Sequence, residues 1–344
     1  MRRTALLLLL TLALCLTGCA QNAVKPAPGM DEPTSVQIGL SMDSLVIERW
    51  QRDRDVFVSH AKELGMEVLV QDAGGDVNEQ IEQIRYFIRK RVRAVVVVAV
   101  DCNALTAVIK EARDAGVVVI SYDRLIQNAP VDLYVSFDNE KVGRLMAENL
   151  IANVPAGGRI VCINGSETDN NVHDLRRGFL DEINRSTLRI VYTEYCHNWE
   201  AQDAYDYMQQ VLGEGIAFEA VMCGNDDLAS MVYKALSERA LIDDVVLVGQ
   251  DADLSACQRI AAGWQSMTVH KQVETLARRA AECVHTLLGG GEVAPTGFIN
   301  NGYADVPSIL LEPVAVTREN IDAVIVDGGF HTRDDVYTNV RSEE

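Results

Sequence analysis

Polar and charged side chains follow many of the apolar, β-branched runs of this sequence, where they could bind a ligand. In the first half they are Asp43, Glu48-Arg49-Trp50, Asp101-Cys102-Asn103, Tyr122-Asp123-Arg124 and Asp138-Asn139-Glu140. In the second half they are Asn164-Gly165-Ser166, Asp169-Asn170-Asn171, His197-Asn198-Trp199, Gly224-Asn225, Gln250-Asp251 and His270-Lys271. Carboxylates accept hydrogen bonds from hydroxyl groups, arginine and lysine donate them, amides do both, and indole faces cover C–H surfaces. The set therefore fits a small, uncharged ligand rich in hydroxyl groups, which is the chemistry of a neutral sugar.

Structural roles compete with this interpretation at each position. Asp and Asn after a strand also serve as helix N-caps, and Asp138, Asp169 and Asp227 could each do so. Trp50 lies at helical spacing and could be a core residue, whereas Trp199 lies in a polar stretch that gives an indole less structural reason. The binding interpretation rests on the number of such positions, because no single one decides between the roles.

The elements that must position these side chains alternate between short apolar runs and helical patterns. We predict strands over 36–40, 67–70, 94–100, 117–121, 133–137, 159–163, 189–192, 220–223, 245–249, 266–269 and 314–316, and helices over 47–64, 79–90, 105–115, 140–151, 174–184, 201–212, 227–240, 254–262 and 273–288. Runs that are apolar throughout, such as 95–98, are typical of parallel strands covered on both faces. The pattern predicts an α/β fold with two doubly wound parallel sheets. Ligands of such sheets bind beyond the carboxyl ends of the strands, where the polar residues lie.

The chain begins with a segment of another kind. Arg2 and Arg3 precede an apolar stretch over 5–16, which is too short to span a bilayer comfortably. Such a start is typical of a signal peptide. The following Leu16-Thr17-Gly18-Cys19 resembles the bacterial lipobox, which implies cleavage before Cys19 and a lipid on its sulfur. A plain secreted or an uncleaved N-terminus is the alternative.

Composition and missing motifs narrow the function classes. The 344 residues are 48% hydrophobic and carry a formal charge of −19, which argues against a disordered chain and against nucleic acid as a partner. The sequence has no GxxxxGKS or GxxxxGKT, no GxGxxG after the first strand, no HExxH, no GxSxG and no CxxC. We therefore predict neither an enzyme nor a metal or cofactor.

Six cysteines remain once Cys15 and Cys19 are set aside. They are Cys102, Cys162, Cys196, Cys223, Cys257 and Cys283. Several lie in apolar strand or helix patterns, where a free thiol behaves as a small hydrophobic side chain. We predict buried free thiols in preference to a disulfide framework, which a chain of this size does not need.

Five blocks of sequence support a family resemblance. They are 45–55 around Glu48-Arg49-Trp50, Tyr122-Asp123-Arg124, 135–143 around Asp138-Asn139-Glu140, Gly249-Gln250-Asp251-Ala252-Asp253 and Asn300-Asn301-Gly302. In this order they resemble the type I periplasmic sugar-binding proteins of bacterial ABC importers, in particular those that bind D-xylose. The likeness extends from about residue 36 to about residue 332.

The resemblance implies two Rossmann-like lobes joined by a three-segment hinge that close on a pyranose. Its matched motifs imply nine sugar contacts, namely Arg49, Trp50, Asp123, Arg124, Asn171, Trp199, Asn225, Asp251 and Lys271. The sequence departs from the family pattern at His197-Asn198, which replace Asp-Gly, and at Ser166-Glu167-Thr168. D-xylose is the leading ligand, and glucose or a related pyranose is the alternative.

The domain organisation follows from these features. We expect a signal peptide over 1–18, a lipidated Cys19 with a flexible tether over 19–34, and a C-terminal tail over 336–344. The N-terminal lobe would comprise 35–138 plus 271–312, and the C-terminal lobe 139–270 plus 313–335. Such a protein would be a monomer in the periplasm or at the cell surface, anchored to the membrane by its lipid, that delivers its sugar to the permease subunits of an ABC importer. A sugar sensor that presents its closed form to a chemoreceptor or histidine kinase is the alternative, and a sugar-acting enzyme is a third hypothesis.

Overall fold

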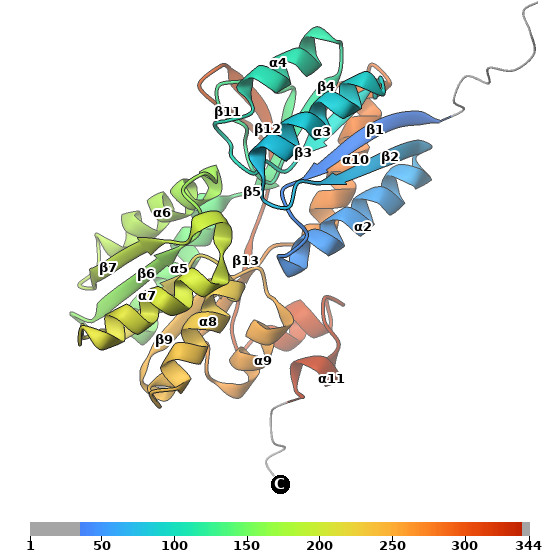
Figure 1. The fold of residues 1–344 in the computed structure, drawn as a ribbon. Coiled ribbons are helices and arrows are strands. Elements are labelled where there is room, and N and C mark those ends of the chain that lie inside the picture. The colour runs from blue at the N-terminus through green and yellow to red at the C-terminus, as the bar shows by residue number, and fades with distance from the viewer. Residues whose placement is uncertain (1–34, 339–344) are drawn as a thin grey trace, which may run out of the picture. The chain divides into compact units, whose positions relative to one another are not determined.

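Two β-sheets, each covered by helices on both faces, make up the part of the chain that the computed structural model describes, residues 35–338 (Figure 1). These residues belong to one compact unit. The predicted signal peptide, Cys19 and the tether lie outside the described residues. Within 35–338 no helix has the length and apolar character that crossing a membrane requires.

The first sheet has seven strands in the order β11-β12-β5-β4-β3-β1-β2. Its strands are β1 (Val36–Met42), β2 (Met66–Asp72), β3 (Ala94–Val97), β4 (Val118–Tyr122), β5 (Leu133–Phe137), β11 (Gly297–Asn300) and β12 (Asp305–Leu311). All neighbouring pairs are parallel except β11 and β12. Its helices are α2 (Glu48–Glu63), α3 (Val77–Arg89), α4 (Thr106–Asp114) and α10 (Val273–Leu288).

The side chains of β3 show why helices cover both faces of this sheet. Val96 packs in the cluster formed with α2 and α10, whereas Val95 and Val97 pack in the cluster formed with α3 and α4. Successive side chains of a strand point to opposite faces, so an unbroken run of valines fills both layers. The predicted doubly wound arrangement is confirmed.

The second sheet has six strands in the order β13-β10-β9-β8-β6-β7. Its strands are β6 (Arg159–Asn164), β7 (Arg189–Tyr195), β8 (Ala220–Cys223), β9 (Val246–Gln250), β10 (Met267–His270) and β13 (Val314–Val316), of which only β13 runs antiparallel to its neighbour. Its other elements are α5 (Asn139–Asn153), α6 (Asn170–Ile183), η1 (His197–Trp199), α7 (Ala201–Gly213), α8 (Asp226–Ser237), η2 (Ile242–Asp244), α9 (Leu254–Ala262), the π-helical η3 (Asp322–Val326) and α11 (Arg333–Val336). Helices α5 and α6 cover one face, and α7 and α8 cover the other.

The chain passes between the two sheets three times, after β5, after β10 and after β12. Helix α5 follows β5 but packs with the second sheet, and α10 follows β10 but packs with the first. The three-segment connection that the resemblance implied is therefore present. The exact residue boundaries of the two lobes remain a prediction. Val336, the first residue of the predicted C-terminal tail, is buried at the end of α11.

Three elements differ from the sequence prediction. Strand β3 ends at Val97 although the apolar run continues to Val100, because the side chain of Gln80 takes the place of a neighbouring strand: its Nε2 donates to Val98 O (2.8 Å), and its Oε1 accepts from Val100 N (2.8 Å). Helix α6 begins four residues earlier than predicted, at Asn170. The hairpin β11–β12 was not predicted, because β11 is a largely exposed edge strand whose residues carry no apolar alternation.

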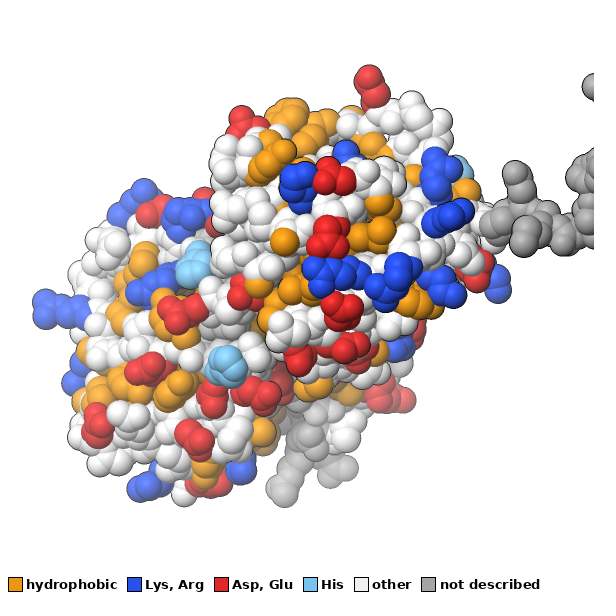
Figure 2. Space-filling view, turned by 45° about the horizontal axis from the view of Figure 1, so that its top comes forward, with side chains coloured by type: hydrophobic (Ala, Val, Ile, Leu, Met, Phe, Trp, Pro, Cys, Tyr) orange, Lys and Arg blue, Asp and Glu red, His pale blue; other side chains and the backbone are white. Residues whose placement is uncertain are grey.

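All six cysteines between 35 and 338 are buried and free, which confirms the prediction of free thiols. Burial raises the pKa of these groups, for instance to about 12 at Cys162, so they stay protonated. On the face shown in Figure 2, Asp and Glu side chains are interspersed with Lys and Arg. This mixed charge is typical of a solvated exterior.

Candidate functional site

One cavity is lined by all nine residues that the resemblance implied. The space between its atoms, mouth included, is about 470 Å³. Its lining consists of Arg49, Trp50, Asp123, Arg124, Asn171, Trp199, Asn225, Asp251 and Lys271, together with Ile47, Asn164, Gly165, Asp169, Val172, Leu175, Gly224 and Gln250. Both lobes contribute to this wall, at the carboxyl ends of their parallel strands, as expected for open α/β sheets.

Asp123 and Asp251 occupy equivalent positions in the two lobes. They follow β4 and β9, which have the same place in the order of their sheets. The backbone N–H of Asp123 donates to Val135 O, and that of Asp251 donates to Val269 O, both at 2.8 Å. Both residues have a left-handed backbone, with φ of 62° and 97°. A non-glycine residue adopts this conformation at a cost, and here it places one carboxylate from each lobe in the cavity wall.

Arg49, in the first turn of α2, is surrounded by carboxylates. Its Nη2 lies 2.9 Å from Asp123 Oδ2, and its Nη1 lies 3.7 Å from Asp251 Oδ1 in the other lobe. Its Nε and Nη2 also donate to the two oxygens of Asp53, both at 3.3 Å. The hydroxyl of Tyr122 donates to Asp53 as well. The guanidinium is thus held in place by its own lobe and linked to the other.

Burial and these neighbours act in opposite directions on the carboxylates. Burial alone would raise the pKa of Asp123, but the positive charges of Arg49, Lys271 and Arg124 outweigh it and hold that pKa below its usual value. At Asp53 burial outweighs Arg49, and the pKa is raised. Asp123 is therefore ionised at neutral pH and is available as a hydrogen-bond acceptor.

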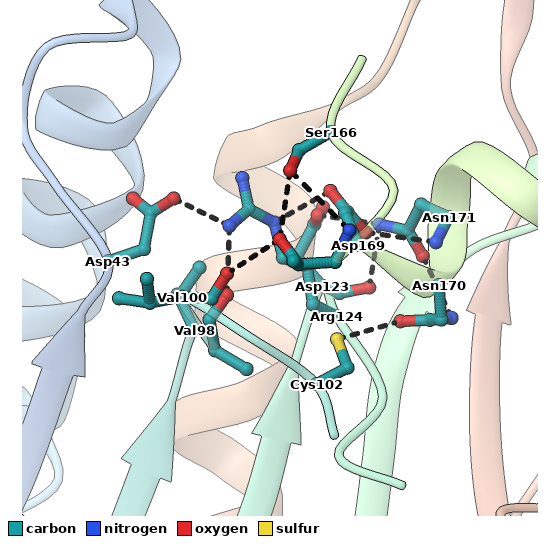
Figure 3. Close-up of polar contacts among 12 residues, drawn as sticks. Asp43, Val98, Val100, Cys102, Asp123, Arg124, Ser166, Asp169, Asn170 and Asn171 are labelled. Carbon is teal, nitrogen blue, oxygen red and sulfur yellow. Dashed lines mark hydrogen bonds and ion pairs between the residues drawn. The ribbon is translucent and has the colours of Figure 1, made fainter. Parts of the chain in front are cut away.

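Arg124 bridges the lobes at a second point (Figure 3). Its Nη1 contacts Asp43 Oδ2 at 2.5 Å and donates to Ala99 O at 2.8 Å, both in the N-terminal lobe. Its Nε lies 2.8 Å from Asp169 Oδ2, which belongs to the C-terminal lobe. A buried arginine between two carboxylates has a fixed orientation, so the donors that remain free are fixed as well.

The two asparagines owe their positions to helix starts. Asp169 caps α6 by accepting from Asn171 N at 2.9 Å, which places Asn171 in the first turn, where its Nδ2 donates to Asp123 Oδ1 at 3.0 Å. Asn225 caps α8 through its Oδ1, which accepts from Leu228 N at 2.9 Å. Its Nδ2 is left as a donor toward the cavity that it lines.

The cap predictions are thus partly confirmed. Asp169 is a cap, and Asp138 caps α5 by accepting from Lys141 N at 2.8 Å. The prediction was wrong for Asp227, because α8 begins one residue earlier than we expected and Asn225 takes the cap position. Capping and lining the cavity are not exclusive, since Asp169 and Asn225 do both.

The two indoles reach the cavity in different ways. Trp50 is 2% exposed, packs in the core cluster of the first sheet, and has the Arg49 guanidinium 4.3 Å from its ring centroid. Trp199 ends the short turn η1, with φ of 62°. Its ring lies on two glycines that directly follow strands β6 and β8: a Cβ on Gly165 would be 2.2 Å from the ring, and one on Gly224 would be 3.2 Å away. Trp50 therefore combines the core role with the site role, whereas only glycine leaves room for the ring of Trp199.

Seven buried polar atoms of the cavity wall have no hydrogen-bond partner among the residues described. Three of them, Asp123 Oδ2, Arg124 Nε and Asp251 Oδ1, lie in ion pairs. The other four have neither kind of partner. They are Trp50 Nε1, Asn164 Oδ1, Trp199 Nε1 and Gln250 Oε1. Each such atom costs about 1–3 kcal/mol when buried. Two are donors and two are acceptors, so a ligand whose groups both donate and accept, such as a hydroxyl, would satisfy them.

Asn164 and Gln250 were not among the nine implied residues. The signal for them was nevertheless present, because Asn164 is the last residue of the apolar strand β6 and Gln250 the last residue of β9. Residues 35–338 contain no group of three or more His, Cys, Asp or Glu side chains that could hold a metal ion. The site as built is suited to reversible polar contacts.

Known proteins are similar to this chain over most of its length. The model of the periplasmic binding protein domain family matches residues 38–292. The D-xylose-binding periplasmic protein of Haemophilus influenzae is 40% identical over 307 residues, which cover 88% of this chain and 92% of that protein. The protein of the same name from Escherichia coli is 38% identical over 331 residues, or 95% and 97% of the two chains.

Solved structures give the same result for the fold. An ABC transporter solute binding protein from Clostridium phytofermentans, with bound β-D-glucose, superposes with a TM-score of 0.80 at 27% identity. The match covers 87% of this chain and 99% of that one. A carbohydrate transporter solute binding protein from Chloroflexus aurantiacus, in complex with D-glucose, also gives 0.80, at 28% identity over 87% and 98% of the chains.

Proposed function

Since the chain belongs to the periplasmic binding protein family, we propose that it captures D-xylose between its two lobes and delivers the sugar to an ABC permease. Members of this family bind solutes and are not enzymes. The observation that carries the proposal is the cavity that both lobes line with nine side chains of the kinds that bind sugars, together with four buried polar atoms that lack partners. The names of the two relatives with about 40% identity support xylose as the ligand.

The chemistry of each side chain fits a neutral pyranose. Asp123 and Asp251 would accept hydrogen bonds from sugar hydroxyls, while Arg124 and Lys271 would donate them. The indoles of Trp50 and Trp199 would pack against the C–H faces of the ring. Asn171, Asn225 and Arg49 complete the set.

Contacts from both lobes also explain how a bound sugar can change the conformation of the protein. A ligand shifts a conformational equilibrium only by its different affinity for the two states. A sugar that touches Arg124 in one lobe and Asn225 in the other makes all its contacts only when the lobes are together. Occupancy would therefore favour the closed arrangement, which a permease can recognise by shape.

A calorimetric screen of pentoses and hexoses tests the proposal. D-xylose should bind most tightly, and both Asp251→Ala and Arg124→Ala should abolish its heat of binding. Asp55→Ala, which removes an exposed carboxylate from α2, is the matched control and should bind like wild type. If no sugar binds, the proposal fails; if a hexose binds more tightly than xylose, the sugar is wrong and the class is right.

Gly165→Ala should weaken sugar binding by about ten- to a hundredfold while changing the midpoint of thermal unfolding little. The added methyl group would meet the ring of Trp199 at 2.2 Å, so the indole must leave its place in the wall and its packing on the sugar is lost. The expected loss of affinity corresponds to about 1.4–2.8 kcal/mol. Gly213→Ala adds a methyl group where nothing lies within 4 Å and should bind normally. Unchanged affinity in Gly165→Ala would show that Trp199 does not contact the sugar.

Cys19 is proposed to carry the lipid anchor, on the evidence of its sequence alone. Wild-type protein expressed in its bacterial host should partition with membranes and incorporate radiolabelled palmitate. Cys19→Ala should incorporate no palmitate, because the substitution removes the sulfur that would carry the lipid. Palmitate incorporation that persists in Cys19→Ala would contradict the lipobox assignment.

Delivery to a permease can be separated from sensing by deleting the gene. Loss of xylose uptake supports transport. Uptake that persists, together with a lost response to xylose, would show instead that the protein is a sensor.

A further inference from the structure

The turn that carries Asp251 is a strained part of the cavity wall. Asp251 and Ala252 are consecutive non-glycine residues in the left-handed region, with φ of 97° and 57°, and both are buried. Such a pair persists only where the surrounding structure over-determines it. The direction of the Asp251 carboxylate therefore depends on whatever holds this turn.

The equivalent turn in the N-terminal lobe is held by its own sheet. The carbonyl oxygen of Asp123 accepts from Tyr134 Oη at 2.9 Å and from Ser136 Oγ at 2.6 Å, and both donors lie on β5. In the C-terminal lobe His270 has the place of Ser136, since it follows Val269 on β10 as Ser136 follows Val135 on β5. Its Nδ1, however, has no partner among residues 35–338.

A donor from the C-terminal segment reaches the next carbonyl of this turn, that of Ala252. The sheet itself holds Ala252 through its N–H, which donates to Thr268 Oγ1 at 3.1 Å, and Cys257 Sγ lies 3.5 Å from the same carbonyl oxygen. Nε2 of His331 lies 2.8 Å from the carbonyl oxygen of Ala252. Burial lowers the pKa of His331, so the ring is neutral at pH 7, and a proton on Nε2 makes it a donor to that carbonyl. The contact joins residues 79 positions apart, which is why no strand-end pattern could indicate it.

Phe330 packs against His331, with ring centroids 4.7 Å apart, and links this segment to the other lobe. The ring of Phe330 lies 4.5 Å from that of His270 and 4.1 Å from the guanidinium of Arg52. Arg52 Nη1 also donates to the carbonyl oxygen of Phe330 at 3.0 Å. Arg52 lies one helical turn beyond Arg49 on α2, so the helix that contacts Asp251 directly also holds the segment that supports its turn.

We propose that His331 is a positioning residue for sugar binding: it holds the Asp251–Ala252 turn through Ala252 O and so aims the Asp251 carboxylate at the ligand. This inference rests on the proposed function, because it assumes that the cavity binds a sugar. His331 lies some sixty positions beyond Lys271 in the sequence and is not among the residues that line the cavity.

The test compares His331→Met, His331→Gln and a control, His285→Ala, by calorimetry with D-xylose. Methionine fills much of the space of the ring but cannot donate, so affinity should fall about tenfold. Glutamine can present an amide N–H near the position of Nε2 and should restore affinity to within about threefold of wild type. His285 is exposed on α10, and its replacement should change nothing.

Hydrogen exchange in the sugar-free protein gives a second readout that does not depend on binding. The amides of Ala252 and Asp253 should exchange faster in His331→Met than in wild type, while those of Asp123 and Arg124 should not. Equal affinities and equal exchange in all variants would overturn the inference, as would a His331→Gln variant as weak as His331→Met. If wild type binds no sugar, the proposed function fails, and the exchange rates alone still decide whether His331 holds the turn.

Discussion

Arg49→Met is expected to lower the free energy of unfolding by about 3–5 kcal/mol at pH 7 and to abolish measurable sugar binding. The guanidinium is the shared partner of Asp53, Asp123 and Asp251. Its loss leaves buried carboxylates without their nearest positive charge, which costs far more than the loss of an exposed ion pair. Denaturant unfolding and calorimetry measure the two effects separately.

The control for this variant lies in the same helix. Arg54 pairs with Asp55 at 2.7 Å, near the surface, so Arg54→Met should change stability by less than about 1 kcal/mol. It should leave sugar binding intact. An Arg49→Met variant as stable as Arg54→Met would contradict the central role of Arg49.

The pH dependence of the Arg49→Met defect identifies its cause. In wild type the lowered pKa of Asp123 means that its ionised form contributes stability above the pKa of the unfolded chain, and that this contribution is lost as pH falls through the folded pKa. Without Arg49 the pKa values of Asp53 and Asp123 rise, so the folded variant binds protons that wild type does not. The stability gap should therefore narrow between pH 7 and pH 4, whereas a gap independent of pH would indicate lost packing on Trp50 instead.

The fold was largely predictable because its core obeys local rules. The run Val95 to Val98 fills both faces of a parallel strand, and this pattern recurs in both halves of the chain. Two features were not predicted, the end of β3 and the strand β11, because no local apolar pattern marks them. The run could not reveal that Gln80 ends β3, and the exposed residues of β11 carry no pattern that distinguishes them from a loop.

The candidate site likewise has a part that the sequence predicts and a part that it does not. Strand ends meet at one edge of a parallel sheet, so the positions of Asp123 and Asp251 beside a common cavity follow from sequence order and fold class. The contacts that hold the side chains of the site in place do not follow from sequence order. The support of Asp251 by His331, and the link from Arg124 to Asp169, depend on where the C-terminal segment and the start of α6 lie in three dimensions.

The last prediction uses that link to separate two roles of Arg124. Arg124→Ala should weaken sugar binding about a thousandfold or more, since it removes a donor to the ligand and leaves Asp43 and Asp169 buried without their partner. Asp169→Asn removes only the charge across the lobes, because asparagine caps a helix as well as aspartate does. It should keep α6 intact and weaken binding by about ten- to a hundredfold.

Calorimetry gives the two affinities, and small-angle scattering of the sugar-loaded proteins reports whether the lobes close. Asp169→Asn should still become more compact at saturating sugar, because Asn171 continues to join the lobes through Asp123. Arg124→Ala should not. If the two variants weaken binding equally and both close, then Arg124 acts only as a bridge to Asp169, and the hydroxyl assigned to it must be bound by another donor, for which Lys271 is the nearest in kind.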